Sequence, residues 1–250
     1  MALRRARPSR AGCVWSEATV KFGIVVFPGS WSHQDFYHVI VNVLKEEACY
    51  LWHKEADLNG SDCLILPGGF AHGDYLRTGA IARFSPVMKE VARFAAAGGP
   101  VLGSCNGFQI LTEAGLLPGA LLRNDCLHYR CRWVYLSAQS PDTPFTSAMQ
   151  EGQVVRMPIS HGEGRYYVDR ETHQRLLERD QIVFRYCDEQ GDLTGAANPN
   201  GSLDHIAGVC NDRRNVVGLM PHPERAAETI LGSEDGRLMF ASILDTVARA

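Results

Sequence analysis

Residues 22–44 read FGIVVFPGSWSHQDFYHVIVNVL and decide the fold class. The almost wholly apolar run from Phe22 to Phe27 has the length of a strand and is typical of one buried on both faces of a parallel sheet. Pro28-Gly29-Ser30 ends this run, and Asp35 stands near the start of a helical pattern. Apolar side chains then recur on one helical face: Phe36, Val39, Ile40, Val43 and Leu44. The stretch therefore predicts a strand, a loop and an amphipathic helix.

The same alternation continues as far as residue 103. Tyr50 to His53 and Cys63 to Leu66 have the pattern of strands. A helix is expected over Ala80 to Ala97, and Pro100 to Gly103 is predicted to be a further short strand. Strands that alternate with helices indicate an α/β fold with a mostly parallel sheet, flanked by helices and joined by right-handed crossovers.

The second half of the chain is richer in strands. Two β-rich stretches lie between about residues 130 and 168 without a convincing helix between them, and three more follow Gln181. We expect these strands to extend the sheet in mixed orientation. A closing helix is predicted from apolar residues at helical spacing: Phe240, Ile243, Leu244 and Val247. Because no repeat, heptad or linker is present, residues 21–250 are predicted to form one domain.

The composition is that of an ordinary globular protein. The 250 residues are 45% hydrophobic and 21% charged, and no apolar run approaches the roughly 18 residues that span a membrane. Lysine and arginine together number 25 against 28 acidic residues, which gives a formal net charge of −3. No global positive field would attract a nucleic acid or an anionic membrane, so neither is expected as a partner.

The eight cysteines include no C-x-x-C pair, so the signature of a structural zinc site or a dithiol redox site is lacking. Several lie inside apolar runs and are expected to be small buried side chains. A chain of this length can build its core without disulfides, which favours a cytoplasmic location. A metal site at His33, His38 and His72 lacks carboxylate ligands at suitable spacing, so no metal is expected.

The first twenty residues differ from the rest. They carry four arginines and one acidic residue, Glu17. An arginine-rich and acid-poor start is found in transit peptides, but this one is short and has no apolar secretion segment. The alternatives are a disordered tail and a start site placed too far upstream, with the natural chain beginning near Val20.

Gly103-Ser104-Cys105-Asn106-Gly107 gives the sharpest signal for chemistry. A strand end, a G-x-C-x-G turn and an apolar helix predict a nucleophile elbow, in which glycines two positions either side of the nucleophile leave room for the neighbouring backbone. The positive N-terminal end of the helix would favour the reactive thiolate of Cys105. The alternative is a buried cysteine in a glycine-rich turn.

Met220-Pro221-His222-Pro223-Glu224 offers the base that a nucleophilic thiol needs. Residues that precede proline avoid the helical region, so the segment is expected to be extended, with side chains two residues apart on the same side. Glu224 can then accept a hydrogen bond from one ring nitrogen of His222 and leave the other nitrogen for Cys105. Taken alone, His222 is equally compatible with a structural role.

Acyl transfer also requires donors for the oxyanion, the negatively charged oxygen that forms when a carbonyl is attacked. Leu66-Pro67-Gly68-Gly69-Phe70 ends beside Cys105 if the two preceding strands are neighbours in the sheet. We expect the backbone amides of Gly69 and Asn106 to be these donors. The alternative for the glycine pair is a tight turn after a strand.

Six separated blocks occur in one order: FPGS at 27–30, PGGFAHGDYLRTGAIARFSP at 67–86, GSCNGFQILTEAGLLPGAL at 103–121, HGEGRYY at 161–167, NPNGS at 198–202 and MPHPERA at 220–226. Together they resemble the class I, or triad, glutamine amidotransferases. Within that class they are most similar to the glutaminase subunits of phosphoribosylformylglycinamidine synthases of purine biosynthesis. The resemblance covers about residues 21–248.

The resemblance implies a flavodoxin-like class I glutaminase fold with a β-rich extension, and L-glutamine as the substrate. Cys105 would attack the side-chain amide and form a thioester, His222 would protonate the departing ammonia, and Glu224 would orient the histidine. Contacts with the bound glutamine are implied for three further residues: Gln109, His161 and Glu163.

The resemblance also implies a division of labour between subunits. Ammonia would pass to a separate, large synthetase subunit that depends on ATP and works with a small accessory subunit, and the isolated chain would hydrolyse glutamine poorly. ATP and Mg²⁺ are expected on that partner and no cofactor is expected on this chain, which lacks a G-x-x-x-x-G-K-[ST] phosphate loop.

Two alternatives stay open. The chain could supply ammonia to a different synthetase, for GMP, carbamoyl phosphate or histidine, although the GDYLR and NPNGS blocks argue against this. It could instead be a DJ-1-like binding module without glutaminase activity, although such modules lack the downstream His-Pro-Glu.

Overall fold

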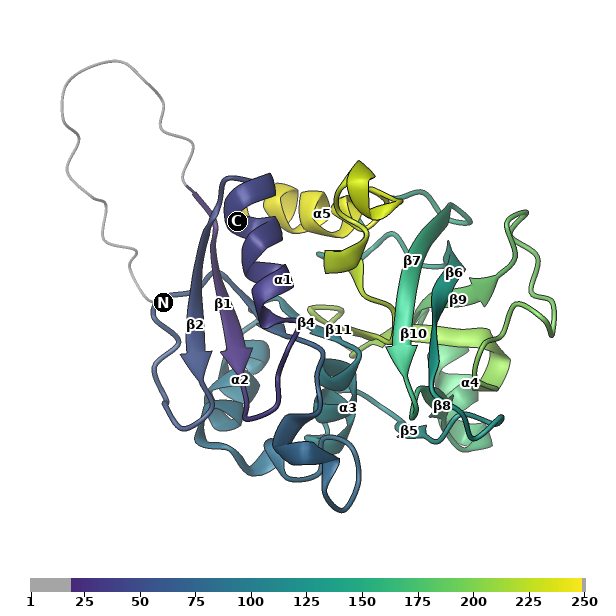
Figure 1. Ribbon diagram of the computed structural model, residues 1–250, viewed down its shortest axis with the longest axis horizontal. Coiled ribbons are helices and arrows are strands. Elements are labelled where there is room, and N and C mark those ends of the chain that lie inside the picture. The colour runs from purple at the N-terminus through teal and green to yellow at the C-terminus, as the bar shows by residue number, and fades with distance from the viewer. Residues whose placement is uncertain (1–18, 249–250) are drawn as a thin grey trace.

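The computed structural model describes residues 19–248, and a nine-stranded sheet runs through it in the order β2-β1-β3-β4-β11-β10-β9-β6-β7 (Figure 1). Adjacent strands are parallel throughout the first five of this order. These strands are β2 (Glu47–Trp52), β1 (Lys21–Val26), β3 (Cys63–Leu66), β4 (Val101–Ser104) and β11 (Val216–Leu219). The mostly parallel α/β sheet predicted from the sequence is confirmed.

The remaining strands of the large sheet pair in antiparallel fashion from β11 outward. They are β10 (Ile206–Cys210), β9 (Ile182–Cys187), β6 (Arg130–Ala138) and β7 (Val154–His161). A separate two-stranded sheet is formed by β5 (Ala120–Leu122) and β8 (Arg165–Tyr167). The expected mixed, β-rich extension is therefore present.

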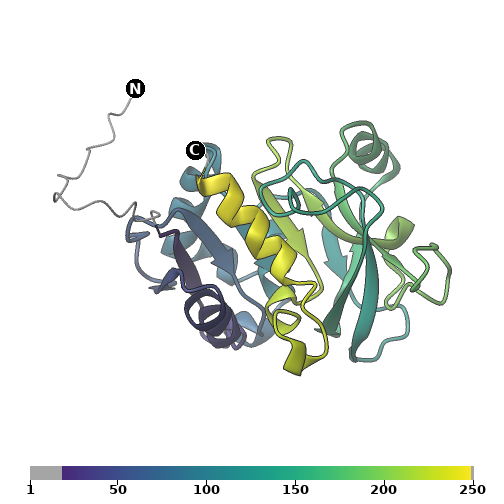
Figure 2. The ribbon, with the colours of Figure 1, turned by 90° about the horizontal axis from the view of Figure 1, so that it is seen from above.

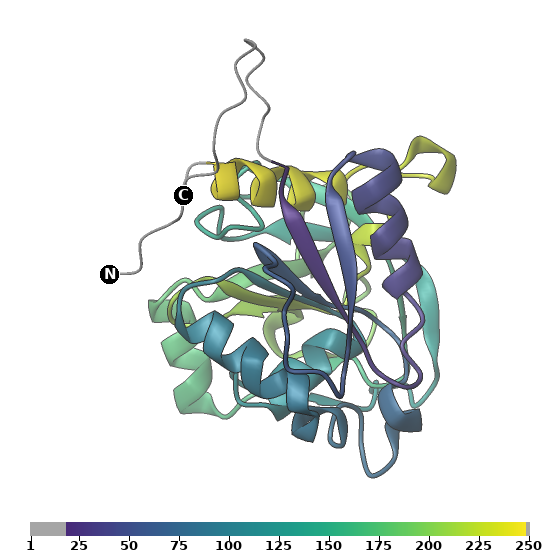
Figure 3. The ribbon, with the colours of Figure 1, turned by 90° about the vertical axis from the view of Figure 1, so that its left-hand side faces the viewer.

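Helices cover both faces of the parallel half. On one face lie α1 (His33–His38) and the closing helix α5 (Arg237–Ala248), which crosses the strands in Figure 2. The opposite face carries α2 (Pro86–Ala96) and α3 (Asn106–Glu113), seen on the other side of the strands in Figure 3, with α4 (Arg170–Glu178) further along.

Two apolar cores explain the apolar strand sequences. In β3, Cys63 and Ile65 face the core under α1 and α5, whereas Leu64 and Leu66 face the core under α2 and α3. Successive side chains of a strand point to opposite faces, so a strand covered on both sides must be apolar at every position. All four residues of β3 are fully buried.

The two predicted helices of the first half are interrupted. The first passes from α1 into a π-helical turn at Val39–Val43, where the Leu44 amide donates to the Val39 carbonyl at 2.9 Å; consecutive β-branched residues are poor helix formers. The helix expected over Ala80 to Ala97 starts only at Pro86, because Ser85 before the proline is extended (ψ 143°).

Short 3₁₀ turns also occur at Ala71–Asp74, Ala82–Phe84, Leu203–His205, Pro223–Arg225 and Thr229–Leu231.

Three elements, α4, β5 and β8, were not predicted. Only Leu176 of α4 is buried, so the helix lacks the apolar stripe that periodicity detects. Its start is nevertheless marked by Asp169, whose side chain accepts a hydrogen bond from the Thr172 amide at 2.7 Å. An aspartate three residues before a threonine was the available signal.

The described part of the chain begins inside the predicted N-terminal tail. Val20 is buried, and its amide donates to Glu46 Oε2 at 2.7 Å. Residues 1–18 of the predicted tail lie outside the described residues. Among residues 19–248, no helix is both long enough and apolar enough to cross a membrane.

Candidate active site

Cys105 stands at the sharp turn between β4 and α3. Its backbone adopts φ 51° and ψ −107°, a strained conformation for a residue with a side chain. A Cβ at Gly107 would collide with the carbonyl group of Leu66, and one at Gly103 would lie 2.8 Å from the Gly107 carbonyl oxygen. The two glycines are therefore required by the close approach of β3, β4 and α3, as expected of a nucleophile elbow.

The ends of three neighbouring strands bring the predicted residues together. Strand β4 pairs with β3 on one side and with β11 on the other. The loop after β3 carries Gly69, the turn after β4 carries Cys105, and the loop after β11 carries His222. Because the strands are parallel, all three loops leave from the same edge of the sheet.

His222 and Glu224 form a buried pair. The Nδ1 atom of His222 lies 2.6 Å from Oε1 of Glu224, and both side chains are fully shielded from solvent. The His222 amide donates to the Pro158 carbonyl at 2.9 Å, which anchors the loop to β7. Ser104 adds a hydroxyl that donates to Glu224 Oε2 at 3.4 Å. This serine was not predicted as part of the site.

The route to this pairing differs in part from the one predicted. His222 is extended (φ −108°, ψ 92°), but Pro223–Arg225 forms a 3₁₀ turn instead of continuing the extended chain. The fixed φ of proline suits the first position of such a turn, and the Arg225 amide closes it on the His222 carbonyl at 3.2 Å. The turn still places the Glu224 carboxylate against the imidazole.

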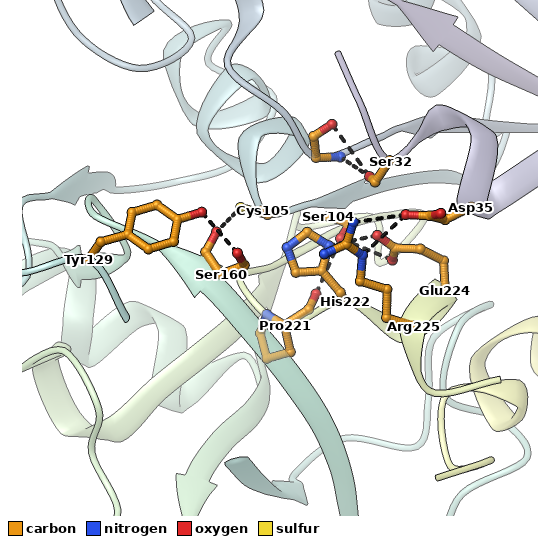
Figure 4. A network of polar contacts seen from close by, with 11 residues as sticks. Ser32, Asp35, Ser104, Cys105, Tyr129, Ser160, Pro221, His222, Glu224 and Arg225 are labelled. Carbon is orange, nitrogen blue, oxygen red and sulfur yellow. Dashed lines mark hydrogen bonds and ion pairs between the residues drawn. The ribbon is translucent and has the colours of Figure 1, made fainter. Parts of the chain in front are cut away.

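The imidazole separates the carboxylate from the thiol. Figure 4 shows Cys105 and Glu224 on opposite sides of the His222 ring. Burial alone would lower the pKa of His222, but the negative charges of Glu224 and Cys105 outweigh it and raise this pKa to about 10. Within the described residues Nε2 of His222 has no hydrogen-bond partner at normal distance. The arrangement places a protonated imidazole beside the thiol, as a histidine that exchanges protons with a nucleophilic cysteine requires.

The expected oxyanion donors lie next to the thiol. Gly69 has φ 154° and bridges to Ser30, and a Cβ on it would come within 2.7 Å of the Gly29 carbonyl oxygen. Asn106 is the first residue of α3, where a helix leaves its amides free. Within the described residues, the amides of Gly69 and Asn106 donate to no other protein group. Both remain available to a ligand.

A cavity of about 160 Å³ opens beside Cys105. Four of the five residues predicted to bind substrate line it, namely Gly69, Gln109, His161 and Glu163, and Asn106 lies directly behind them. The remaining lining residues are Phe70, Asp74, Thr78, Tyr129, Ser160 and Gly162. The volume suits one amino acid, not a peptide or a nucleotide.

A polar network forms the floor of this cavity. The Asn106 amide group donates to Gln109 Oε1 at 2.9 Å and to Asp74 Oδ1 at 3.3 Å. Gln109 in turn donates to the Glu163 carbonyl at 2.6 Å. Burial and the nearby charge of Glu163 raise the pKa of Asp74 to about 6. Two carboxylates thus meet in the cavity, and only Glu163 was predicted as a substrate contact.

His161 lines the cavity, but its ring is held elsewhere. Nδ1 lies 3.1 Å from Asn124 Oδ1, and Nε2 lies 3.5 Å from the amide nitrogen of Asn200. Burial and the neighbouring His222 lower the pKa of His161 to about 3, so its ring is neutral. A Cβ at Gly164 would collide with the ring. These contacts support a role in shaping the loop around Glu163.

Other groups near the thiol were not singled out from the sequence. The thiol of Cys105 lies 3.6 Å from the Ser160 carbonyl oxygen, and the Tyr129 hydroxyl lies 2.9 Å from Ser160 Oγ (Figure 4). Ser32 is completely buried and bonds to Gly68. Asn200 belongs to the NPNGS block, which marked its region without indicating its role.

No cluster of three or more histidine, cysteine or acidic side chains in the described part of the chain is placed to hold a metal ion. His38 pairs with Glu228 at 2.8 Å, and His72 packs its ring edge-on against His53 with centroids 5.1 Å apart. The three histidines considered from the sequence therefore do not converge. The seven cysteines within residues 19–248 are all free.

Comparison with known proteins gives one family. Residues 19–237 match the CobB/CobQ-like glutamine amidotransferase domain. The phosphoribosylformylglycinamidine synthase subunit PurQ of Moorella thermoacetica is 58% identical over 226 residues, which are 90% of this chain and 96% of that protein. The protein of the same name from Salinibacter ruber is 53% identical over 230 residues, or 92% of this chain and 98% of its own length.

Solved structures agree with these similarities. A chain in the structure of PurLQS from Thermotoga maritima is 41% identical, with a TM-score of 0.80, and the match covers 92% of this chain and 99% of that one. A glutamine amidotransferase from Thermotoga maritima is 17% identical, with a TM-score of 0.55 over 92% of this chain and 99% of its own. At that identity the likeness extends to the fold alone.

Proposed function

The chain belongs to the CobB/CobQ-like glutamine amidotransferase family, and from this premise we propose that it is the glutaminase subunit of a phosphoribosylformylglycinamidine synthase. One observation carries the chemistry: a strained cysteine lies between a cavity the size of an amino acid and a buried histidine–glutamate pair. The identity of 58% with the PurQ protein of Moorella thermoacetica, over nearly the whole of both chains, carries the choice of acceptor.

The first chemical step joins Cys105 to glutamine. The thiolate sulfur attacks the carbonyl carbon of the side-chain amide, and the electron pair of the C=O bond moves onto oxygen. The backbone amides of Gly69 and Asn106 donate to this oxyanion. Removal of one preorganised donor of this kind lowers kcat by about 10²- to 10³-fold.

The second step releases ammonia. His222, protonated at Nε2, gives its proton to the amide nitrogen as the tetrahedral intermediate collapses, so that the C–N bond breaks and a thioester remains on Cys105. Glu224 keeps the imidazole in orientation through Nδ1. Water, deprotonated by His222, then attacks the thioester, and glutamate leaves with the thiolate restored.

The α-amino and α-carboxyl groups of glutamine would bind on the side of the cavity away from Cys105. An α-ammonium group needs a carboxylate or carbonyl acceptor, and the cavity offers Asp74 and Glu163. Glu163 is itself steadied by the Thr78 hydroxyl at 3.3 Å and by Arg123 at 3.6 Å. Gln109 and Asn106 hold these groups in place, and His161 fixes the backbone of the loop that carries Glu163.

Ammonia released in this cavity is useful only if it reaches an acceptor. We infer that the chain works with two other subunits, a large synthetase and a small accessory protein, and its similarity to a chain in the structure of PurLQS from Thermotoga maritima supports such an assembly. The synthetase converts formylglycinamide ribonucleotide to formylglycinamidine ribonucleotide. It would bind the ATP and Mg²⁺ for that reaction, in the cytoplasm.

The test reconstitutes the complex with its synthetase and its accessory protein and measures formylglycinamidine ribonucleotide with glutamine or with ammonium salt as the nitrogen source. Cys105→Ala should abolish the glutamine-dependent reaction and leave the ammonia-dependent reaction largely intact. A glutamine-derived diazo ketone should label the native Cys105 and not the variant. Loss of both reactions would show that Cys105 is structural, and efficient supply to a different synthetase would overturn the choice of acceptor.

A further inference from the structure

Ser32 is a fully buried polar residue that the mechanism above does not use. It lies in the loop between β1 and α1, and its Oγ accepts a hydrogen bond from the Gly68 amide at 2.8 Å. The same hydroxyl lies 3.4 Å from the Gly68 carbonyl oxygen, to which it donates. The loop adds two backbone donors to that oxygen, the amides of Trp31 and Ser32, each at 3.2 Å. Gly68 is therefore held at both its amide and its carbonyl.

The Gly68 carbonyl and the Gly69 amide belong to one peptide unit. A trans peptide is planar, and its C=O and N–H point in opposite directions. Three donors on the side of Ser32 fix the direction of the carbonyl, so they also fix the direction of the Gly69 N–H. Gly69 lines the cavity beside Cys105, which places the free amide on the reacting side.

Gly68 itself is in contact with the reacting groups. A Cβ built on it would lie 2.7 Å from Cε1 of His222 and 3.4 Å from Cβ of Cys105. No larger residue fits, and rotation of this peptide would bring the Gly68 carbonyl oxygen toward the thiolate, where it would repel the developing oxyanion. The orientation of a single peptide thus decides whether the site has a donor or an acceptor at this point.

We propose that Ser32 is a positioning residue that keeps the Gly68–Gly69 peptide turned so that the Gly69 amide faces the oxyanion. The proposal rests on the proposed function, because it assigns Ser32 to the acyl-transfer step at Cys105. The loop that carries Ser32 is itself tied to the triad. Arg225, next to Glu224, donates to Asp35 at 2.9 Å and stacks on Trp31 at 4.0 Å.

The experiment compares Ser32→Ala with Ser242→Ala in the assembled complex. Ser242 is a matched control: it is equally buried, accepts from the Ala148 amide at 2.9 Å and donates to the Leu238 carbonyl at 2.7 Å, but it lies on α5. We expect Ser32→Ala to lower kcat of the glutamine-dependent reaction by about tenfold to a hundredfold, with KM changed less than about threefold, since a misaligned donor acts on the transition state. Ser242→Ala should leave both constants within about twofold.

Two further measurements separate positioning from general damage. Ser32→Cys, whose thiol can still accept from the Gly68 amide, should recover a substantial part of kcat. An aldehyde analogue of glutamine, which forms a tetrahedral adduct with the thiolate, should lose affinity for Ser32→Ala by about the same factor as kcat falls. Ammonia-dependent activity should not change.

Several results would overturn the role of Ser32. The first is an unchanged kcat in Ser32→Ala. The second is an equal fall in kcat in Ser242→Ala. The third is a rise in KM of Ser32→Ala without any fall in kcat. If Ser32→Ala does not fold, an inactive but folded Ser32→Cys with unaltered aldehyde affinity would also contradict it. Failure of the proposed function is distinct, because it would show in Cys105→Ala as loss of the ammonia-dependent reaction as well, or as efficient supply of ammonia to a different synthetase.

Discussion

Nδ1 of His222 lies 2.6 Å from Oε1 of Glu224, with neither side chain accessible to water. In this setting the carboxylate selects the tautomer of the neutral ring and stabilises the ring when it is charged. Replacement of Glu224 by glutamine keeps the shape but removes the charge. We expect Glu224→Gln to lower the glutamine-dependent kcat by at least about a hundredfold, while ammonia-dependent synthesis by the complex is preserved.

Glu228→Gln is a suitable control for that substitution. Glu228 pairs with His38 at 2.8 Å, in the same chemical combination but on the exposed surface. Its loss should leave kcat within about twofold, because exposed ion pairs contribute little. Equal effects of the two substitutions on steady-state kinetics would argue against a special role for Glu224.

The raised pKa of His222 makes folding stability depend on pH. The folded ring titrates near pH 10, whereas an unfolded histidine titrates near its ordinary value of 6.5. A folded group that binds its proton more tightly contributes stability that is complete below about pH 6.5 and is lost as pH rises toward 10. We therefore expect wild type and Glu224→Gln to differ in their free energy of unfolding, and this difference should shrink as pH rises. Denaturant unfolding at pH 6, 8 and 10 measures it. A constant difference would mean that His222 is neutral in the folded protein.

Asp74 predicts a pH dependence of the opposite kind, in substrate binding. Burial and the proximity of Glu163 raise its pKa to about 6, so below that pH it is protonated and loses its attraction for an α-ammonium group. KM for glutamine should rise as pH falls through 6, with little change in kcat. In Asp74→Asn the KM should be high throughout, by about tenfold, and nearly independent of pH in this range.

The control for Asp74 is the exposed Asp212, which pairs with Arg179 on the surface and does not line the cavity beside Cys105. Asp212→Asn should reproduce the wild-type pH profile of KM. If Asp74→Asn does so as well, the ammonium group is bound by Glu163 or by backbone carbonyls alone.

Local signals account for the parts of the site that the sequence predicted. The elbow at Cys105 is specified by glycines two residues away, and His222 and Glu224 are near neighbours in the chain. Ser32 and Gly68 are 36 residues apart, and no pattern indicates that they meet. The same holds for His161, whose ring contacts Asn124 and Asn200, which are 37 and 39 residues away in the sequence. Such contacts arise from the order of the strands in the sheet, and the periodicity of residues within one helix or strand does not predict that order.

In the fold, too, the elements with a local sequence signal could be predicted and the others could not. Buried strands such as β3 need apolar residues at every position, so their composition reveals them. Helix α4 buries only Leu176, and apart from the exposed Leu177 its other residues are polar, so only its capping aspartate indicates where it begins. Pro86 shows that a single residue with a fixed φ overrides a helical pattern that spans it.

Gly107 provides the strongest prediction for stability. A Cβ there would overlap the Leu66 carbonyl group, which belongs to the backbone of β3 and cannot move aside without breaking the contact between β3 and α3. We expect Gly107→Ala to lower the free energy of unfolding by about 3 kcal/mol or more, in the range of severe overpacking. Gly195 is the matched control, because a Cβ on it would meet nothing within 4 Å and its φ is not left-handed. Gly195→Ala should change stability by less than about 0.5 kcal/mol in denaturant unfolding. Near-equal midpoints for the two variants would mean that α3 can shift away from β3, and the elbow would then not require the close packing described for it.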